Sequence, residues 1–427
     1  MIHVEPNEPG GAHLNAKAWL RAAGPIALGS FLLVCCAAAT ERARDLGVPF
    51  EGTPGPLDAI TDVSGVEVGQ TTLIRGSGRL TTGHGPVRTG VTIVHPLGKQ
   101  RHEAVAAGRA VVNGTGEWTG MSLVDEVGRL YGPIALTGTG NLSLVHQALI
   151  DWAVRSGKLS GDELIMRLLP VVGETLDFRL NDVFGHPMSE ADVFDALDGA
   201  TAGPVTEGNV GGGTGMVAYQ FKGGIGTASR RLSADGRHYT VGVLLQANNG
   251  RRMDLRIAGV PIGEEIADLL PRSGSCAPEH TGQEDADGRA VEPAKSSLLV
   301  VIATDAPLDA RQLSRLVRRT ALGIGRMGGT ANDFSGEFAL AFSTSTTFLW
   351  GTASHAEGLI SDTNEGLMDA IFDGTVQAVE EAAVNQLVAS QTMQGINETC
   401  VFALPHDRLI RSLVAHRRLH RAAGNPR

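Results

Sequence analysis

The feature that most constrains the fold is an abrupt change of composition just before residue 297. Residues 271–295 are rich in Ser, Gly, Pro, Glu and Asp, whereas residues 298–303 read Leu-Leu-Val-Val-Ile-Ala. Because the polar segment carries too little apolar surface to form a core, we expect a loop there. A short, wholly apolar run that follows a loop predicts a buried strand. The chain should therefore enter its core at this point.

Ser297 lies at the junction between the loop and the strand. A cut between Ser296 and Ser297 would leave an α-amino group beside the hydroxyl of residue 297. An amine with an ordinary pKa of about 7.7–8.0 can serve as the base for that hydroxyl. The simpler interpretation is a solvated serine at a strand boundary, and this stretch alone favours the simpler one.

The composition sets broad limits on fold and partners. With 427 residues, 42% of them hydrophobic, the chain can bury a large core as one big domain or two ordinary ones. A net charge of −10 argues against nucleic acid as a partner.

The N-terminal 40 residues have the pattern of a targeting segment. Lys17 and Arg21 precede an uncharged stretch, residues 22–40, that closes with small residues. This pattern predicts that residues 1–40 are a signal peptide or an N-terminal anchor. We expect a periplasmic or secreted protein, or a cytoplasmic one if the leader is not functional. Beyond the leader, Cys276 and Cys400 are the remaining cysteines, and we expect Cys276 to be an exposed thiol rather than part of a disulfide scaffold.

Helical and strand patterns alternate along the chain. Strands are predicted at 91–94, 134–136 and 338–342, an antiparallel pair within 219–247, and helices at 142–152, 311–324 and 368–387. This alternation in both halves predicts an α/β protein with layers of helix and sheet.

Several polar residues stand out against this background. Ser335 and Glu337 precede the strand at 338–342, and their period-2 spacing predicts side chains on the same face. Asn248 closes a predicted strand, and Glu174 lies in the sequence Gly-Glu-Thr-Leu-Asp. Taken singly, these residues also fit a Ser-Gly-Glu turn, an Asn-Gly hairpin and a surface glutamate.

Taken together, these residues point to one family. Ser297, the run Ala-Thr-Asp-Ala-Pro-Leu at 303–308, the stretch 334–343 and the glycine-rich block 207–216 resemble the L-aminopeptidase/D-amidase-esterase (DmpA) and β-peptidyl aminopeptidase family of self-cleaving serine hydrolases. The resemblance extends from Glu41 to about Leu404. It implies a four-layer αββα sandwich of the type that ornithine acetyltransferase also has.

The resemblance also implies a division of the chain and an activity. Residues 41–296 would form an α chain that includes the linker 271–295, and residues 297–427 would form a β chain of the same domain. The enzyme would release N-terminal residues from short peptides, amides or esters without a metal or organic cofactor. Whether it accepts L-α, D-α or β-amino acids stays open. The resemblance further implies a homo-oligomer of αβ units, a tetramer.

The family's functional residues carry over by position. Ser297 would be the nucleophile, and Ser335 with Glu337 its supporting pair. Asn248 would donate to the oxyanion, and Glu174 would meet the free amino group of the substrate. The chain departs from the family pattern twice: Ser296 stands where glycine or asparagine is usual, and Leu176 where tyrosine is usual. We expect slower self-cleavage from the first change and a missing phenol donor from the second.

Three alternatives stay open at this point. If Ser296 and Leu176 disable the site, the chain is a catalytically impaired binding protein. Gly-Gly-Gly-Thr-Gly at 211–215 also occurs in tubulin-like GTPases, which suggests a nucleotide-binding protein, although the loop leads into a predicted strand rather than a helix. The third alternative is an ornithine acetyltransferase, which has the same type of fold. Those enzymes cleave before threonine, whereas residue 297 is serine.

Overall fold

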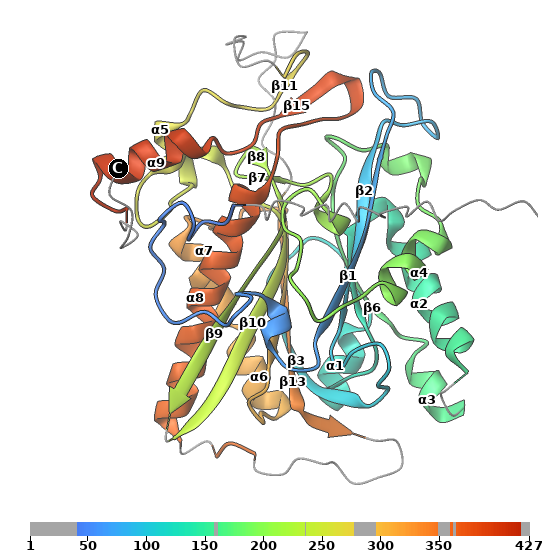
Figure 1. The fold of residues 1–427 in the computed structure, drawn as a ribbon. Coiled ribbons are helices and arrows are strands. Elements are labelled where there is room, and N and C mark those ends of the chain that lie inside the picture. Colours follow the sequence, from blue (N-terminus) through green and yellow to red (C-terminus); the bar gives the residue numbers. More distant parts are fainter. Residues whose placement is uncertain are drawn as a thin grey trace, which may run out of the picture. The chain divides into compact units, whose positions relative to one another are not determined.

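Two β-sheets lie face to face at the centre of the fold (Figure 1). The computed structural model describes residues 41–157, 161–234, 236–276, 296–348, 359–361 and 364–419. One sheet has the strand order β1-β2-β5-β6 and the other the order β4-β3-β13-β12-β10-β9. The strands of the first sheet are β1 (Glu67–Arg75), β2 (Val87–His95), β5 (Ile134–Gly138) and β6 (Val171–Thr175). Those of the second are β3 (Ala104–Gly114), β4 (Arg129–Leu130), β9 (Gly224–Ala234), β10 (Arg237–Asn248), β12 (Ser297–Thr304) and β13 (Gly336–Phe348).

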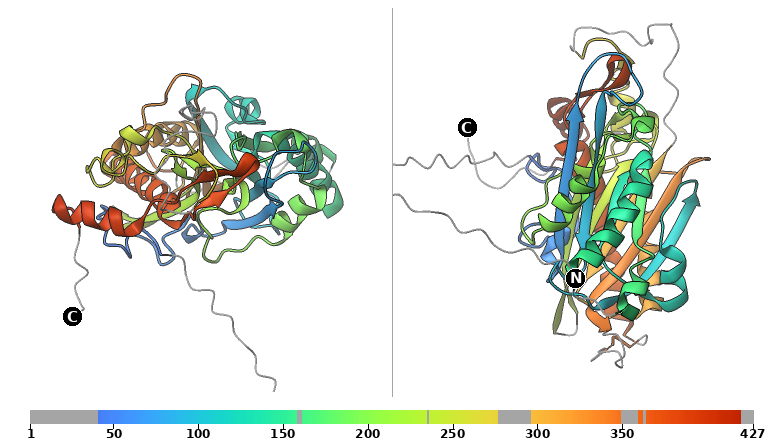
Figure 2. Two further views of the ribbon diagram at one scale, coloured as in Figure 1. Left: turned by 90° about the horizontal axis from the view of Figure 1, so that it is seen from above. Right: turned by 90° about the vertical axis from the view of Figure 1, so that its right-hand side faces the viewer.

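Helices cover the outer face of each sheet. The four-stranded sheet is covered by α2 (Leu142–Ser156) and α4 (Glu190–Asp198), which lie in front of the strands in the right-hand view of Figure 2. The six-stranded sheet is covered by α6 (Ala310–Val317), α7 (Thr320–Arg326) and α8 (Glu365–Ala389). The layers therefore run helix, sheet, sheet, helix, and the predicted αββα sandwich is confirmed.

The remaining elements are shorter. They are α1 (Met121–Val127), α3 (Gly161–Met166), α5 (Ile262–Glu265), α9 (His406–Ala415), β7 (Val217–Ala218), β8 (Phe221–Lys222), β11 (Arg272–Ser273), β14 (Met393–Gln394), β15 (Thr399–Val401) and the 3-10 turns η1 (Ile60–Asp62), η2 (Thr139–Asn141), η3 (Val183–Gly185), η4 (Gly211–Gly213), η5 (Arg252–Asp254) and η6 (Ile396–Glu398).

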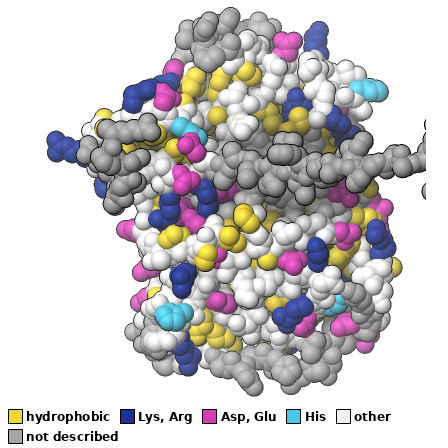
Figure 3. Space-filling model, viewed as in Figure 1, with side chains coloured by type: hydrophobic (Ala, Val, Ile, Leu, Met, Phe, Trp, Pro, Cys, Tyr) yellow, Lys and Arg dark blue, Asp and Glu magenta, His cyan; other side chains and the backbone are white. Residues whose placement is uncertain are grey.

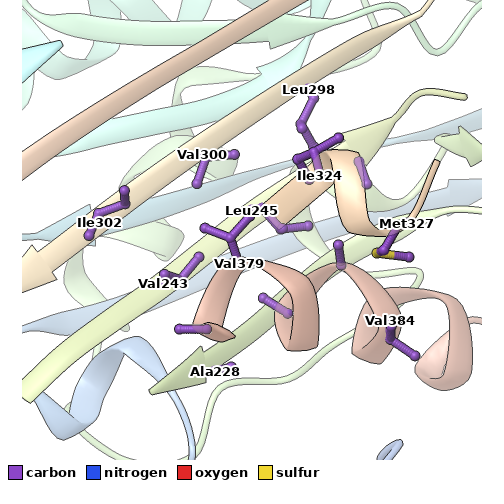
Figure 4. Packing of buried hydrophobic residues seen from close by; sticks show 14 of the residues in the cluster. Ala228, Val243, Leu245, Leu298, Val300, Ile302, Ile324, Met327, Val379 and Val384 are labelled. Carbon is purple, nitrogen blue, oxygen red and sulfur yellow. The ribbon is translucent and has the colours of Figure 1, made fainter. Parts of the chain in front are cut away.

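Strand β12 contributes to both core layers, as its unbroken apolar sequence predicted. Leu299, Val301 and Ala303 face the interior between the two sheets. Leu298, Val300 and Ile302 face the helices, where they belong to the cluster that includes Ile324 of α7 and Val379 of α8 (Figure 4). Because side chains alternate along a strand, a strand covered on both faces is apolar at nearly every position.

Two local predictions differ from the structure. The helix expected at 311–324 is two helices, because α6 ends at Val317 and α7 begins at Thr320. Cys276, expected to be an exposed thiol, forms a disulfide with Cys400, with 5.5 Å between the two Cα atoms. That expectation was wrong because pairing of β11 with β15 brings the two cysteines together across 124 residues of sequence.

Two other predictions concern segments outside the described residues. Residues 1–40, the expected leader, and residues 277–295, most of the expected linker, are not described, so both stay predictions. Within the part of the chain that is described, no helix has the length and apolar character needed to cross a membrane.

On the face shown in Figure 3, basic side chains lie among acidic ones.

Candidate active site

Ser297 is the first residue of β12, which lies inside the six-stranded sheet. Asn248, at the end of β10, is its partner in the antiparallel ladder on one side, and Gly336, at the start of β13, is its partner in the parallel ladder on the other. Ser297 is buried, with 8% of its surface exposed. Three strand ends therefore meet at the residue that the sequence singled out.

The peptide bond between Ser296 and Ser297 is held from two directions. The Gly336 N–H donates to the Ser296 carbonyl oxygen at 2.9 Å, and the Gly250 N–H donates to the Ser296 Oγ at 3.0 Å. If this is the bond that is cut, as the sequence predicts, the donor on its carbonyl lies where negative charge would develop during attack. Among the described non-glycine residues with positive φ, Ser296 is not found. The left-handed backbone for which glycine or asparagine would be needed is therefore not adopted at this position.

Ser335 and Glu337 form a hydrogen-bonded pair next to this bond. The Ser335 Oγ–H donates to the Glu337 Oε2 at 2.7 Å, so the two side chains meet as their spacing predicted. Asn113 of β3 donates through its Nδ2 to the Ser335 Oγ at 3.1 Å and to the Asn332 carbonyl at 2.8 Å. With Asn113 donating to the hydroxyl, the hydroxyl proton is directed at the carboxylate.

Burial raises the pKa of Glu337 above its ordinary value of 4.5, against the opposing effect of the Ser335 hydrogen bond. A carboxylate with a raised pKa is a stronger base for a neighbouring hydroxyl. Glu337 also lines a pocket of about 230 Å³, together with Ser296, Asn249 and residues of α7. Glu337 and the residue before the predicted cut therefore line the same pocket.

Both polar atoms of the Asn248 side-chain amide form hydrogen bonds. Its Oδ1 accepts from the Val217 N–H at 2.9 Å, and its Nδ2 donates to the Leu176 carbonyl at 3.0 Å. An amide nitrogen carries two N–H groups, so the predicted role of donor to the oxyanion needs the second one. Leu176 takes part in this arrangement through its backbone rather than through its side chain.

Glu174 lies on β6, in the other sheet, and is buried. Its Oε1 accepts from the Glu117 N–H at 2.9 Å and its Oε2 from the Thr139 hydroxyl. Within the described parts of the chain, Glu174 forms no ion pair with Lys, Arg or His. A buried carboxylate held by neutral donors is suited to receive an ammonium group from a ligand.

A close approach of the two sheets brings the end of β6 to the start of β12. A Cβ built on Gly173 would lie 2.9 Å from Leu299 and 3.2 Å from Trp118, so a larger residue would force the strands apart. Farther along, the Gln246 Nε2 donates across the sheets to the Thr137 carbonyl at 2.9 Å and to the Thr175 Oγ at 2.7 Å. These contacts link the sheet that carries Glu174 to the sheet that carries Ser297.

Residues 211–213 form the buried 3-10 turn η4. A Cβ on Gly212 would lie 2.0 Å from the Gln246 Oε1 and 2.5 Å from the Leu136 carbonyl oxygen, and one on Gly213 would lie 2.5 Å from the Ile225 nitrogen. The glycines are thus packed against neighbouring strands, and the turn leaves no space for a phosphate.

Lys222, to which sequence reasoning gave no role, supports the same region. Its buried Nζ donates to the carbonyls of Gly213 at 3.2 Å, Met216 at 2.8 Å and Gly223 at 2.6 Å. Burial lowers the pKa of Lys222 well below 10.5, yet three acceptors around one nitrogen match the three donors of an ammonium group. We favour the charged form on this geometry. Lys222 thereby holds the loop that leads to Val217, the backbone partner of Asn248.

The chain is similar to known proteins over most of its length. β-Peptidyl aminopeptidase BapA of Sphingosinicella xenopeptidilytica is 60% identical over 397 residues, which are 92% of this chain and 96% of the relative. The structure of the L-aminopeptidase D-Ala-esterase/amidase of Ochrobactrum anthropi, described as a variant of the Ntn hydrolase fold, matches with a TM-score of 0.75 and 40% identity, and covers 88% of this chain and 99% of that one. A β-aminopeptidase from a Burkholderia species matches with a TM-score of 0.74, 40% identity and the same coverage. Since residues 58–401 also match peptidase family S58, the chain belongs to that family, as the resemblance in its sequence indicated.

Proposed function

We propose that this protein is a self-processing serine aminopeptidase that releases N-terminal residues from short peptides, amides or esters, with Ser297 as its nucleophile. Membership of family S58 supports a serine aminopeptidase or amidase. The observation that carries the proposal is the hydrogen bond from the Gly336 N–H to the carbonyl oxygen of Ser296, the residue immediately before the buried Ser297.

Self-cleavage would begin when the Ser297 Oγ attacks the carbonyl carbon of Ser296. Its proton passes towards the Ser335–Glu337 pair, and the negative charge that develops on the carbonyl oxygen is stabilised by the Gly336 N–H. The C–N bond then breaks, and the nitrogen of Ser297 takes up a proton to become an amine. The resulting ester between Ser296 and the Ser297 Oγ is hydrolysed by water, which frees both chain ends.

In the mature enzyme the new amine would act as the base for the Ser297 hydroxyl. Glu174 would bind the ammonium group of the substrate, and the second N–H of Asn248 would donate to the oxyanion. The acyl group would transfer to the Ser297 Oγ with release of an amine or alcohol, and water would then hydrolyse the ester.

The impaired-binding alternative loses its support at Ser296, whose side chain fits and accepts a hydrogen bond from the Gly250 N–H. At Leu176 the backbone carbonyl holds Asn248, and the Leu176→Tyr variant tests the missing phenol. The relatives named β-peptidyl aminopeptidase and β-aminopeptidase support acceptance of β-amino acids at the N-terminus of the substrate.

Two experiments test this function. The smaller fragment of the purified protein should begin Ser-Leu-Leu-Val-Val-Ile, and Ser297→Ala should stay in one piece. An intact wild-type chain with full activity would exclude self-processing. A panel of p-nitroanilides of L-α, D-α and β-amino acids then gives the substrate class, and no turnover of any of them would exclude the aminopeptidase.

We further propose that residues 1–40 direct export and that αβ units assemble into a homo-oligomer. The uncharged stretch 22–40 supports export, as does the disulfide, because disulfides persist mainly in oxidising compartments. Fractionation of cells followed by N-terminal sequencing tests the first proposal, and light scattering of the purified enzyme tests the second. Full-length protein confined to the cytoplasm and a single αβ unit in solution would contradict them.

A further inference from the structure

We propose that the Cys276–Cys400 disulfide becomes a covalent link between the two chains of the mature enzyme. This inference rests on the proposed cut between Ser296 and Ser297. Cys276 lies 20 residues before the end of the α chain, and Cys400 lies in the β chain. The sequence has four cysteines, at positions 35, 36, 276 and 400, so Cys400 is the single cysteine after the cut. A disulfide between the two chains must therefore use Cys400.

The surrounding structure positions the two cysteines before any oxidation. Strand β11 of the α part pairs with β15 of the β part in two register positions, Arg272 with Cys400 and Ser273 with Thr399. Next to them the Gly274 N–H donates to the Glu398 carbonyl at 3.0 Å. Such a short ladder is a weak attachment once the chain is cut. The disulfide secures this attachment.

The two cysteines differ in exposure. Cys400 is fully buried, whereas Cys276 is partly buried at the end of the described segment. Attack by an external thiol needs access to one of the two sulfurs. Attack in the folded enzyme is therefore limited to Cys276, and we expect reduction to be faster after denaturation, which exposes both sulfurs.

The hairpin that the disulfide anchors also supports the active site. Met393 of β14 and Val401 of β15 pack against Leu180 and Val217. Val217 is the residue whose N–H holds the Oδ1 of Asn248. Since Leu180 and Val217 belong to the α chain, the linked hairpin is a β-chain element that positions an α-chain part of the site.

The test uses the purified full-length protein, treated with N-ethylmaleimide to block free thiols and denatured with and without dithiothreitol. On a gel, the wild type should run as one band without reductant and as two with it. Two bands in both lanes would overturn the link. One band in both lanes would show that no cut occurs, and the proposed function would fail with it.

Variants identify which cysteine pairs with Cys400 and how loss of the disulfide affects activity. Ser297→Ala should give one band in both lanes, whereas Cys400→Ser should give two in both. Cys276→Ser changes the less buried cysteine and should also give two; if it keeps one band without reductant, Cys35 or Cys36 is the partner and the assignment is wrong. Mass spectrometry of a non-reduced digest should show the 276–400 cross-linked peptide. We also expect Cys276→Ser and Cys400→Ser to show a severalfold lower kcat than the wild type, and dithiothreitol should not change the kcat of either variant. An unchanged kcat would overturn the positioning role.

Discussion

Replacing Gly336 with alanine should slow self-cleavage. A Cβ on Gly336 would lie 2.3 Å from the Thr115 carbonyl oxygen and 3.0 Å from the Phe338 ring. Because the first contact is with backbone, a side chain cannot rotate away to relieve it. Gly336 itself must move, and its N–H is the donor to the carbonyl of the bond to be cut.

The size of the effect follows from these distances. Moving the Cβ from 2.3 Å to about 3.0 Å, the lower limit for real contacts, needs a shift of about 0.7 Å. A shift of that size along the N–H···O direction would lengthen the bond from 2.9 Å to about 3.6 Å, beyond hydrogen-bonding distance. Loss of one donor to an oxyanion costs about 2.7–4 kcal/mol of transition-state stabilisation, which slows the reaction roughly 10²–10³-fold.

The assay follows the conversion of freshly synthesised precursor into two chains on a reducing gel. Gly325→Ala is the matched control, because a Cβ at this glycine of α7 meets no atom within 4 Å. It should cleave at the wild-type rate. If Gly336→Ala unfolds cooperatively near the wild-type temperature and still cleaves as fast as the control, the Gly336 N–H has no part in self-cleavage.

Four further predictions concern other parts of the site. Glu174→Gln should raise KM for substrates with a free amino group roughly tenfold or more, the equivalent of about 1.5–3 kcal/mol, and leave self-cleavage intact; equal cleavage of N-acetylated and free substrates by the wild type would contradict the role. Leu176→Tyr keeps the backbone carbonyl that holds Asn248 and adds the phenol that the family usually has, so it should raise kcat. An unchanged kcat would show that the site does not need a phenol donor. Because Glu337 must be ionised to take a proton and burial raises its pKa, the rate of self-cleavage should fall as pH decreases through a value above 4.5; a limb at or below 4.5, measured on the precursor, would contradict this. Lys222→Met should lower kcat roughly tenfold, about 1.4 kcal/mol, with little change in KM, because the loop that supports Asn248 loses three hydrogen bonds; a rise in KM alone would argue against positioning.

The sequence was most informative where the chemistry is local. The polar run before residue 296 and the apolar run after Ser297 predict the start of β12, because the burial of a strand is written in its own residues. Ser335 and Glu337 are two residues apart, so their meeting depends only on the period of a strand. The resemblance to a known family added the sandwich, since periodicity alone does not give strand order.

Contacts between distant segments could not be predicted in this way. Asn113 reaches Ser335 across 222 residues, and nothing in the sequence around it distinguishes it from an ordinary asparagine near a turn. The glycines of η4 looked like a phosphate-binding loop, and only the neighbouring strands show that their role is close packing. The pairing of Cys276 with Cys400 was missed for the same reason.

The sequence by itself therefore determined that Ser297 begins β12 and that the side chains of Ser335 and Glu337 lie on the same face next to it. The tertiary structure decided what surrounds them: the donor on the Ser296 carbonyl, the amide of Asn113 and the ammonium of Lys222. The physical reason is that strand periodicity acts over a few residues of the chain, whereas hydrogen bonds and close packing between sheets depend on distances that only the assembled layers set.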